Sequence, residues 1–264
     1  MPAITFPLEI KEIILELLAE DDSDKGHLAL KTCSLVCQAF LPICRKHIFE
    51  NITLTICNDY VMLSLATSHA FERLLRETPK IADCIRKLDY TILTADLTST
   101  SIQESLKRIS RLEFLSVQYQ DWPGLDWSNN RIRPTLLHLL HLPSLTHFKM
   151  SRITDFVVSD LIPCVNLKYL DIGAFTTVAA ASETTFQANL YEHSIQLREY
   201  VSGVGTSAII MKLCSARRPD GQPIIDFGSL SKITVTLEDP NEIEALQELF
   251  RRCHALTNAH IFCK

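Results

Sequence analysis

Residues 112–117 read LEFLSV, residues 145–150 read LTHFKM and residues 167–172 read LKYLDI, and this spacing decides the fold. Each hexamer has apolar side chains at its first, fourth and sixth positions, as does IRKLDY at residues 85–90. Less regular copies follow at Leu197-Tyr200, Leu230-Ile233-Val235 and Leu256-Ala259-Ile261. The central apolar residues recur every 22 to 33 residues, which indicates a repeated structural unit.

The segments between these hexamers have the apolar spacing of helices. They are Met62–Thr78, Ile102–Ile109, Pro134–Leu142, Phe156–Ile162, Thr206–Ala216 and Glu242–Cys253. A unit of one strand and one helix cannot cover its own apolar side, so stacked units share one core. The pattern predicts an α/β fold in which residues 51–264 form an irregular leucine-rich-repeat solenoid, with parallel strands on its concave face and helices outside. The same alternation is also compatible with a doubly wound parallel sheet.

The first fifty residues have a different texture and predict three short helices. Pro7 suits a first helical turn, and Ile10, Ile13, Ile14 and Leu17 follow on one face. A polar break at residues 20–26 separates this helix from apolar stretches at 28–36 and 40–49. Three helices of this size bury little core, so apolar surface should remain for a neighbour. We expect residues 1–50 and 51–264 to be two domains.

The N-terminal domain resembles the F-box in two places. Its opening is Phe6-Pro7-Leu8-Glu9-Ile10, where the F-box has Leu-Pro-x-Glu-(Ile/Leu). Residues 33–40 read CSLVCQAF, where the F-box has a Val-Cys pair that leads into a bulky aromatic residue. Phe6 stands for the usual Leu and Phe40 for a frequent Trp, and both keep a large apolar anchor. With irregular leucine-rich repeats behind it, the chain is similar to the F-box families of filamentous and mushroom-forming fungi.

The resemblance implies a substrate receptor of an SCF-type cullin–RING ubiquitin ligase, with no catalytic group and no cofactor of its own. Its partners would be a Skp-type adaptor and an unknown protein substrate. The implied adaptor-facing residues, or the core beneath them, are Pro7, Leu8, Ile10, Ile13, Ile14, Leu35, Val36 and Phe40. Because strand residues beside core positions point outward, the expected substrate-facing residues are Lys87, Asp89, Phe114, Gln118, His147, Lys149, Tyr169 and Asp171.

Two other classes of function stay open. In one, the chain is a scaffold and its first three helices merely cap the end of the repeats. In the other, it is a nucleotide-binding enzyme, because residues 203–208 read GVGTSA and Asp226 follows at the distance found in dinucleotide sites. Only a short stretch of chain follows that turn, and no HExxH, GxSxG or GxxxxGK(S/T) motif occurs in the sequence.

Composition excludes several other partners. The net charge is −5 and the basic clusters are short, so we expect no nucleic-acid binding. No apolar run is long enough for a membrane span, and the N-terminus lacks the pattern of a signal peptide. The nine cysteines are scattered without zinc-site spacing, and Asp22–Gly26 does not complete a calcium loop, so we expect no metal. These features predict an intracellular protein of the cytoplasm or nucleus. The strand-like end at residues 261–263 predicts self-pairing, a partner or a longer parent chain.

Overall fold

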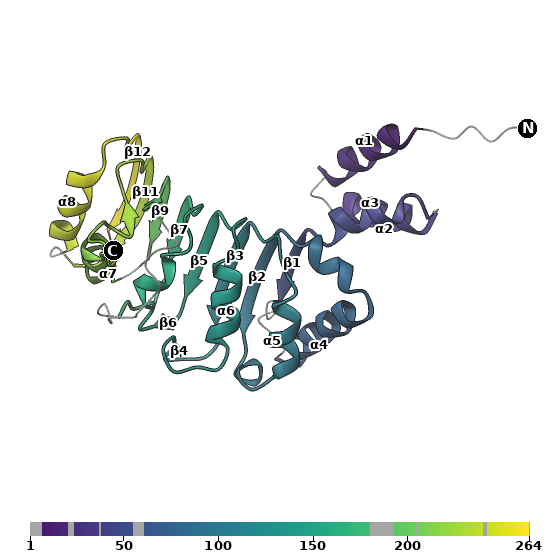
Figure 1. The fold of residues 1–264 in the computed structure, drawn as a ribbon, viewed down its shortest axis with the longest axis horizontal. Coiled ribbons are helices and arrows are strands. Elements are labelled where there is room, and N and C mark those ends of the chain that lie inside the picture. Colours follow the sequence, from purple (N-terminus) through teal and green to yellow (C-terminus); the bar gives the residue numbers. More distant parts are fainter. Residues whose placement is uncertain are drawn as a thin grey trace, which may run out of the picture.

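The computed structural model describes residues 7–20, 24–36, 38–54, 61–179, 193–203, 205–239 and 242–263. It is an α/β fold around a parallel sheet of eight strands, whose spatial order follows the chain (Figure 1). The strands are β1 (Asn51–Leu54), β2 (Lys87–Ile92), β3 (Phe114–Tyr119), β5 (His147–Ser151), β7 (Tyr169–Ile172), β9 (Glu199–Ser202), β11 (Lys232–Leu237) and β12 (Asn258–Cys263). A doubly wound sheet reverses its strand order at a switch point. The described sheet has no such reversal, so that alternative is wrong.

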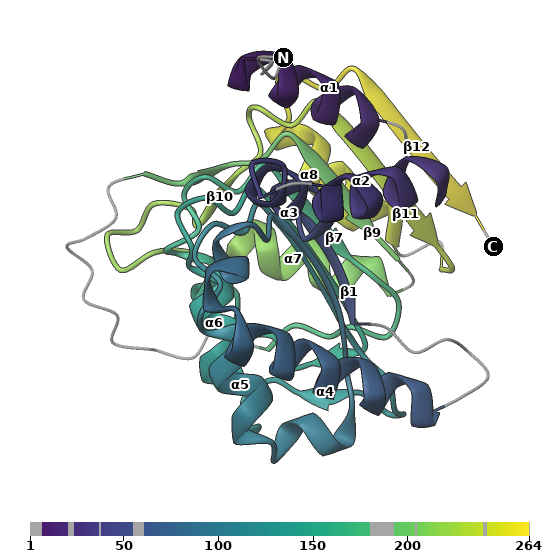
Figure 2. The same cartoon turned by 90° about the vertical axis from the view of Figure 1, so that its right-hand side faces the viewer.

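Helices connect the strands along one side of the sheet. They are α4 (Val61–Glu77), α5 (Thr100–Leu106), α6 (Arg133–Leu140), α7 (Thr206–Ser215) and α8 (Glu242–Arg252), with 3-10 turns η1 (Pro79–Asp83), η2 (Thr94–Leu97) and η3 (Val158–Leu161). Helix α4 contacts α5, and α5 contacts α6, so these three lie side by side (Figure 2). The predicted helix over residues 156–162 is only the turn η3.

Four shorter strands lie outside the main sheet. Strand β4 (Leu125–Asp126) pairs with β6 (Ile153–Thr154), and β8 (Ile195–Gln196) pairs with β10 (Ile225–Asp226), both in parallel. In each pair, the segment that follows one strand of the main sheet is paired with the segment that follows the next strand. The stacking of these units therefore continues outside the eight-stranded sheet.

The register of the sheet explains the repeated hexamers. Leu88, Leu115, Phe148 and Leu170 are aligned on neighbouring strands, and all four are buried. Their alignment produces one continuous core between the sheet and the helices. The residues on either side of them point to the opposite face, which we call the open face of the sheet.

The first three helices lie beyond the β1 end of the sheet (Figure 1). They are α1 (Leu8–Ala19), α2 (Asp24–Val36) and α3 (Leu41–Ile48), and all three contact one another. Their buried residues Leu15, Leu30 and Cys44 form a cluster separate from the main core. Ile48 packs on this small cluster, whereas the next residue, Phe49, packs on the main core.

Strand β12 forms the other edge of the described sheet. It pairs with β11 on one side, and all six of its residues are exposed. Ile261 aligns with buried Val235 but is itself uncovered. The expectation of an unprotected apolar edge strand is therefore confirmed, whereas its self-pairing or its binding of a partner stays a prediction.

Candidate functional site

Helices α1 and α2 expose an unusual amount of apolar surface. The exposed fraction of the residue is 86% for Leu35 and 62% for Leu17. We define the apolar helix face by its exposed residues, which are Ile10, Ile13, Ile14, Leu17, Leu28, Leu35 and Val36. Large apolar residues that are exposed in this number commonly mark a protein interface.

The spacing along each helix explains why this face is left uncovered. In α1, Leu15 points into the small cluster, so residues 10, 13, 14 and 17 lie on a different side of the helix. The cluster contains too few residues to cover two faces of α1 at once. No other described segment of the chain covers the face, which favours a role in binding another molecule.

Most of the residues predicted to face the adaptor lie on this surface. Pro7 is exposed and precedes α1, and five of the predicted apolar residues belong to the apolar helix face. Phe40 is instead half-buried against the small cluster, with the Lys11 ammonium 5.9 Å from its ring centre. The side chain of Leu8 lies outside the described residues. Leu17 and Leu28 also belong to this face; the sequence placed both in apolar helices, but neither was among the residues predicted to face the adaptor.

The residues predicted to face the substrate lie on neighbouring strands of the open face. Lys87, Phe114, His147 and Tyr169 are aligned on β2, β3, β5 and β7. The next row along the strands contains Asp89, Lys149 and Asp171. Gln118 lies one row further on, at the other end of β3. The sheet therefore brings all eight residues onto one surface.

Three rings of the first row form a continuous aromatic strip. The ring centres of Phe114 and His147 are 6.2 Å apart, and those of His147 and Tyr169 are 5.5 Å apart. The planes of neighbouring rings are tilted by only 35° and 30°. Phe114 and Tyr169 are half-buried rather than fully exposed, because each ring packs against the histidine between them. We call Phe114, His147 and Tyr169 the aromatic strip.

Ion pairs fix the charges on one side of the aromatic strip. Lys149 lies 3.3 Å from the carboxylate of Asp171, and Lys232 lies 3.2 Å from that of Glu199. Asp171 was expected to be exposed but is buried, because this ion pair holds it against the sheet. Burial, followed by the negative charges of Asp171 and Glu199, raises the pKa of Tyr169 to about 12. Its hydroxyl therefore stays protonated and acts as a hydrogen-bond donor.

A cavity of about 500 Å³ opens on the other side of the aromatic strip. It is lined by Asn51, Ile52, Thr53, Lys87, Asp89, Glu113, Phe114, Thr146 and His147. The hydroxyl of Thr146 lies 2.8 Å from Nδ1 of His147 and helps to orient the ring. The cavity combines an aromatic wall with charged and amide groups, which is the arrangement of a site that recognises polar groups beside an apolar one.

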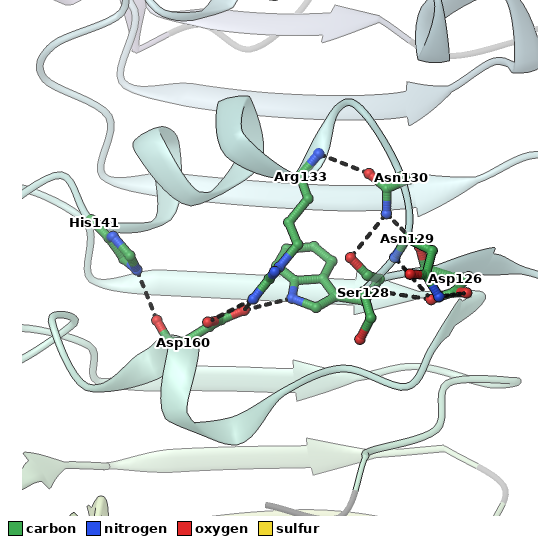
Figure 3. Close-up of polar contacts among 8 residues, drawn as sticks. Asp126, Ser128, Asn129, Asn130, Arg133, His141 and Asp160 are labelled. Atoms are coloured by element: carbon green, nitrogen blue, oxygen red, sulfur yellow. Dashed lines mark hydrogen bonds and ion pairs between the residues drawn. The ribbon is translucent and has the colours of Figure 1, made fainter. Parts of the chain in front are cut away.

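A buried polar cluster lies in the connections behind β3 and β5 (Figure 3). The carboxylate of Asp160 accepts a hydrogen bond of 2.7 Å from the indole N–H of Trp127 and two, of 2.9 and 3.1 Å, from Arg133. Nε2 of His141 donates to the backbone carbonyl of Asp160 at 2.8 Å. Burial of the imidazole lowers the pKa of His141. None of these residues lines the cavity beside the aromatic strip, so we assign the cluster to stability.

Trp122 and Phe175 form a second exposed aromatic feature, which the sequence reading missed. Their rings meet edge to face with centres 5.0 Å apart, yet 70% of Trp122 and 50% of Phe175 are exposed. Phe175 has a φ of 59°, in the left-handed region that is costly for an aromatic residue. Since the two residues are 53 positions apart in the chain, no local pattern could have joined them.

The glycine turn of the nucleotide alternative has a packing explanation. A Cβ atom on Gly203 would lie 2.8 Å from the backbone nitrogen of Ala174, so the neighbouring strand connection already fills the space. Gly205 has a φ of 82° and precedes α7 as a left-handed turn residue. Gly203 therefore accommodates this chain rather than a pyrophosphate. The close approach of Ala174 therefore explains Gly203 without a nucleotide, and the nucleotide-binding alternative gains no support from this turn.

Other groups considered from the sequence do not assemble into a site. His138 is exposed on α6 and His141 belongs to the Asp160 cluster, so the two histidines do not converge. Among the described residues, no three His, Cys, Asp or Glu side chains form a group that could hold a metal ion. Part of the loop Asp22–Gly26 lies outside the described residues. None of the helices in the described ranges is both long and apolar enough to cross a membrane.

No family model matches the chain, and no curated protein matches it. The functional argument therefore rests on the two surfaces themselves.

Proposed function

We propose that the chain is the substrate-recognition subunit of an SCF-type cullin–RING ubiquitin ligase. In this proposal residues 1–50 are an F-box domain that docks a Skp-type adaptor. Residues 51–264 are an irregular leucine-rich-repeat solenoid that holds a target protein on its open face. The chain contributes no catalytic group, and it acts by keeping the target at high effective concentration near the ubiquitin-charged enzyme.

The observation that carries the proposal is the exposure of the apolar helix face. A helical cap would bury its apolar residues against the repeat that it covers. Here the seven residues of the face are exposed, and among the described residues before β1 only Phe49, directly after α3, packs on the main core. This supports docking onto another protein over the scaffold alternative. The separate cluster beneath the face supports a distinct N-terminal domain.

The test is binding of the full chain to a purified Skp-type adaptor. Ile13 is 52% exposed on α1 and is not part of the small cluster, so Ile13→Asp adds a charge to the face without disturbing that cluster. Burying that charge without a partner should weaken binding on the order of thirtyfold or more. Pro7→Ala/Ile13→Asp should abolish it.

Ile243 provides the matched control. It is 48% exposed on α8, at the far end of the sheet, so Ile243→Asp makes the same chemical change at similar exposure. This variant should bind the adaptor as the wild type does. If the folded wild type does not bind, or if both Asp variants weaken binding equally, the helices are a cap and the scaffold function replaces the proposal.

A further inference from the structure

The aromatic strip is bordered by two different kinds of charge. Toward β7, β9 and β11, Lys149 and Lys232 are neutralised by carboxylates of the same face. Toward β2, the exposed Lys87 and Asp89 have no ion-pair partner within the described part of the chain. The β2 side is therefore where a bound molecule could supply complementary charges.

The spacing of these two residues explains why they stay apart. They are two positions apart on one strand, so both side chains point to the open face about 7 Å from each other along the strand. The cavity opens directly above them, with Phe114 and His147 as its wall. A molecule that enters this cavity meets an ammonium group, a carboxylate and two rings at once.

We propose that the cavity and the aromatic strip bind an extended peptide segment of the target, in which an acidic and a basic residue two positions apart face the sheet and a large apolar or aromatic anchor occupies the next position that points the same way. This inference rests on the proposed function and names the target chemistry. In an extended peptide, side chains two positions apart point the same way. Their separation nearly equals that between Lys87 and Asp89, which are also two positions apart on a strand. The acidic residue pairs with Lys87, the basic residue pairs with Asp89, and the anchor covers the rings.

The charge distribution favours a peptide over a nucleic acid. Asp89 and Glu113 place two carboxylates in the cavity, which repel a phosphodiester backbone. The carboxylate of Glu113 lies 3.5 Å from Arg86 and forms its ion pair there, so it does not pair with Lys87. An unpaired charge is costly when an interface is desolvated, so both Lys87 and Asp89 require partners in the bound state.

The experiment selects linear peptides from a random phage-displayed library on the purified full chain. Enriched peptides are synthesised, and their affinities are measured at low and physiological ionic strength. We expect them to share an acidic and a basic residue two positions apart beside an apolar anchor. Lys87→Glu and Asp89→Lys should each weaken binding on the order of tenfold or more, because both leave a repelled charge in the cavity.

Lys107→Glu is the matched control, because Lys107 is an exposed lysine next to α5 on the helical side of the sheet. It should leave peptide affinity unchanged. The double variant Lys87→Glu/Asp89→Lys should select peptides whose acidic and basic positions are exchanged. Phe114→Ser should also lose binding, while the charge variants test the idea even if this variant does not fold.

Failure of this inference is separable from failure of the proposed function. If no peptide is enriched, or if enriched peptides bind Lys87→Glu and Asp89→Lys as tightly as the wild type, recognition of such a segment is overturned. Adaptor binding is measured on the same preparations. Its retention in that case leaves the proposed ubiquitin-ligase function standing without this target chemistry.

Discussion

The buried carboxylate of Asp160 offers a quantitative test of how the connections behind the sheet are held together. Only 1% of this side chain is exposed, and it accepts hydrogen bonds from Trp127 and Arg133. Asp160→Ala would leave a buried indole N–H unpaired, at a cost of about 1–3 kcal/mol. It would also leave Arg133 without its carboxylate, which costs about 3–5 kcal/mol for a fully buried pair.

The expected total is smaller than the sum of these two effects. Arg133 is 26% exposed, so its guanidinium would regain water in the variant. We therefore expect Asp160→Ala to lower the free energy of unfolding by about 3–4 kcal/mol. For a chain of this size that corresponds to a fall of roughly 10 °C in Tm. Asp160→Asn keeps one acceptor oxygen and should lose less.

The assay is denaturant unfolding followed by tryptophan fluorescence. The chain has two tryptophans, so a Trp122→Phe background leaves buried Trp127 as the reporter. The control is Asp126→Ala, because Asp126 is exposed and its carboxylate accepts hydrogen bonds from Ser128 and Asn129 of its own loop (Figure 3). The control should cost about 1 kcal/mol or less. A loss at Asp160 no larger than at Asp126 would refute the reasoning.

Three further outcomes follow from local contacts. Leu15→Ala should cost about 2–5 kcal/mol within the N-terminal cluster, and hydrogen exchange should accelerate in α1–α3 while the sheet is unaffected. Burial raises the pKa of Asp96 above its ordinary 3.8, so the protein is most stable where this carboxyl is protonated. That contribution to stability is lost as the pH rises through the raised pKa. Because Asn cannot ionise, Asp96→Asn should gain stability relative to the wild type across this pH range, as measured by unfolding. Oε2 of Glu242 accepts the N–H of Glu238 at 2.7 Å, so Glu242→Ala should loosen the start of α8 by about 1 kcal/mol, seen as a lower Tm.

The strands were the most predictable part of the fold. All seven central positions of the hexamers lie on parallel strands, because a buried strand face requires apolar residues at fixed intervals. Strand β1 was missed, although Phe49, Ile52 and Leu54 have the same spacing. Those residues were assigned to the end of the third helix and the connection after it. In the structure, only Phe49 and Glu50 separate the end of α3 from the start of β1.

The contacts that complete the surfaces were not predictable from local patterns. Asp160 reaches Trp127 and Arg133 across 33 and 27 residues, and Trp122 reaches Phe175 across an even longer separation. The row from Lys87 to Tyr169 could be anticipated, because strand alternation determines which residues point outward. The register between strands determines which of these charges form ion pairs. The burial of Asp171 and the lack of an ion pair at Lys87 among the described residues are therefore seen only in the three-dimensional arrangement.

The junction between the two surfaces has a consequence for the proposed function. Ile48 packs in the small cluster and Phe49 packs in the main core, so the boundary between them contains no spacer. The carbonyl of Glu50 then accepts hydrogen bonds of 2.8 and 2.9 Å from the backbone N–H groups of Arg86 and Lys87. Lys87 is also the residue that begins the row of the aromatic strip. A partner on the apolar helix face would therefore stand in a fixed relation to a target at the cavity, because the segment that ends α3 also anchors the strand that carries Lys87.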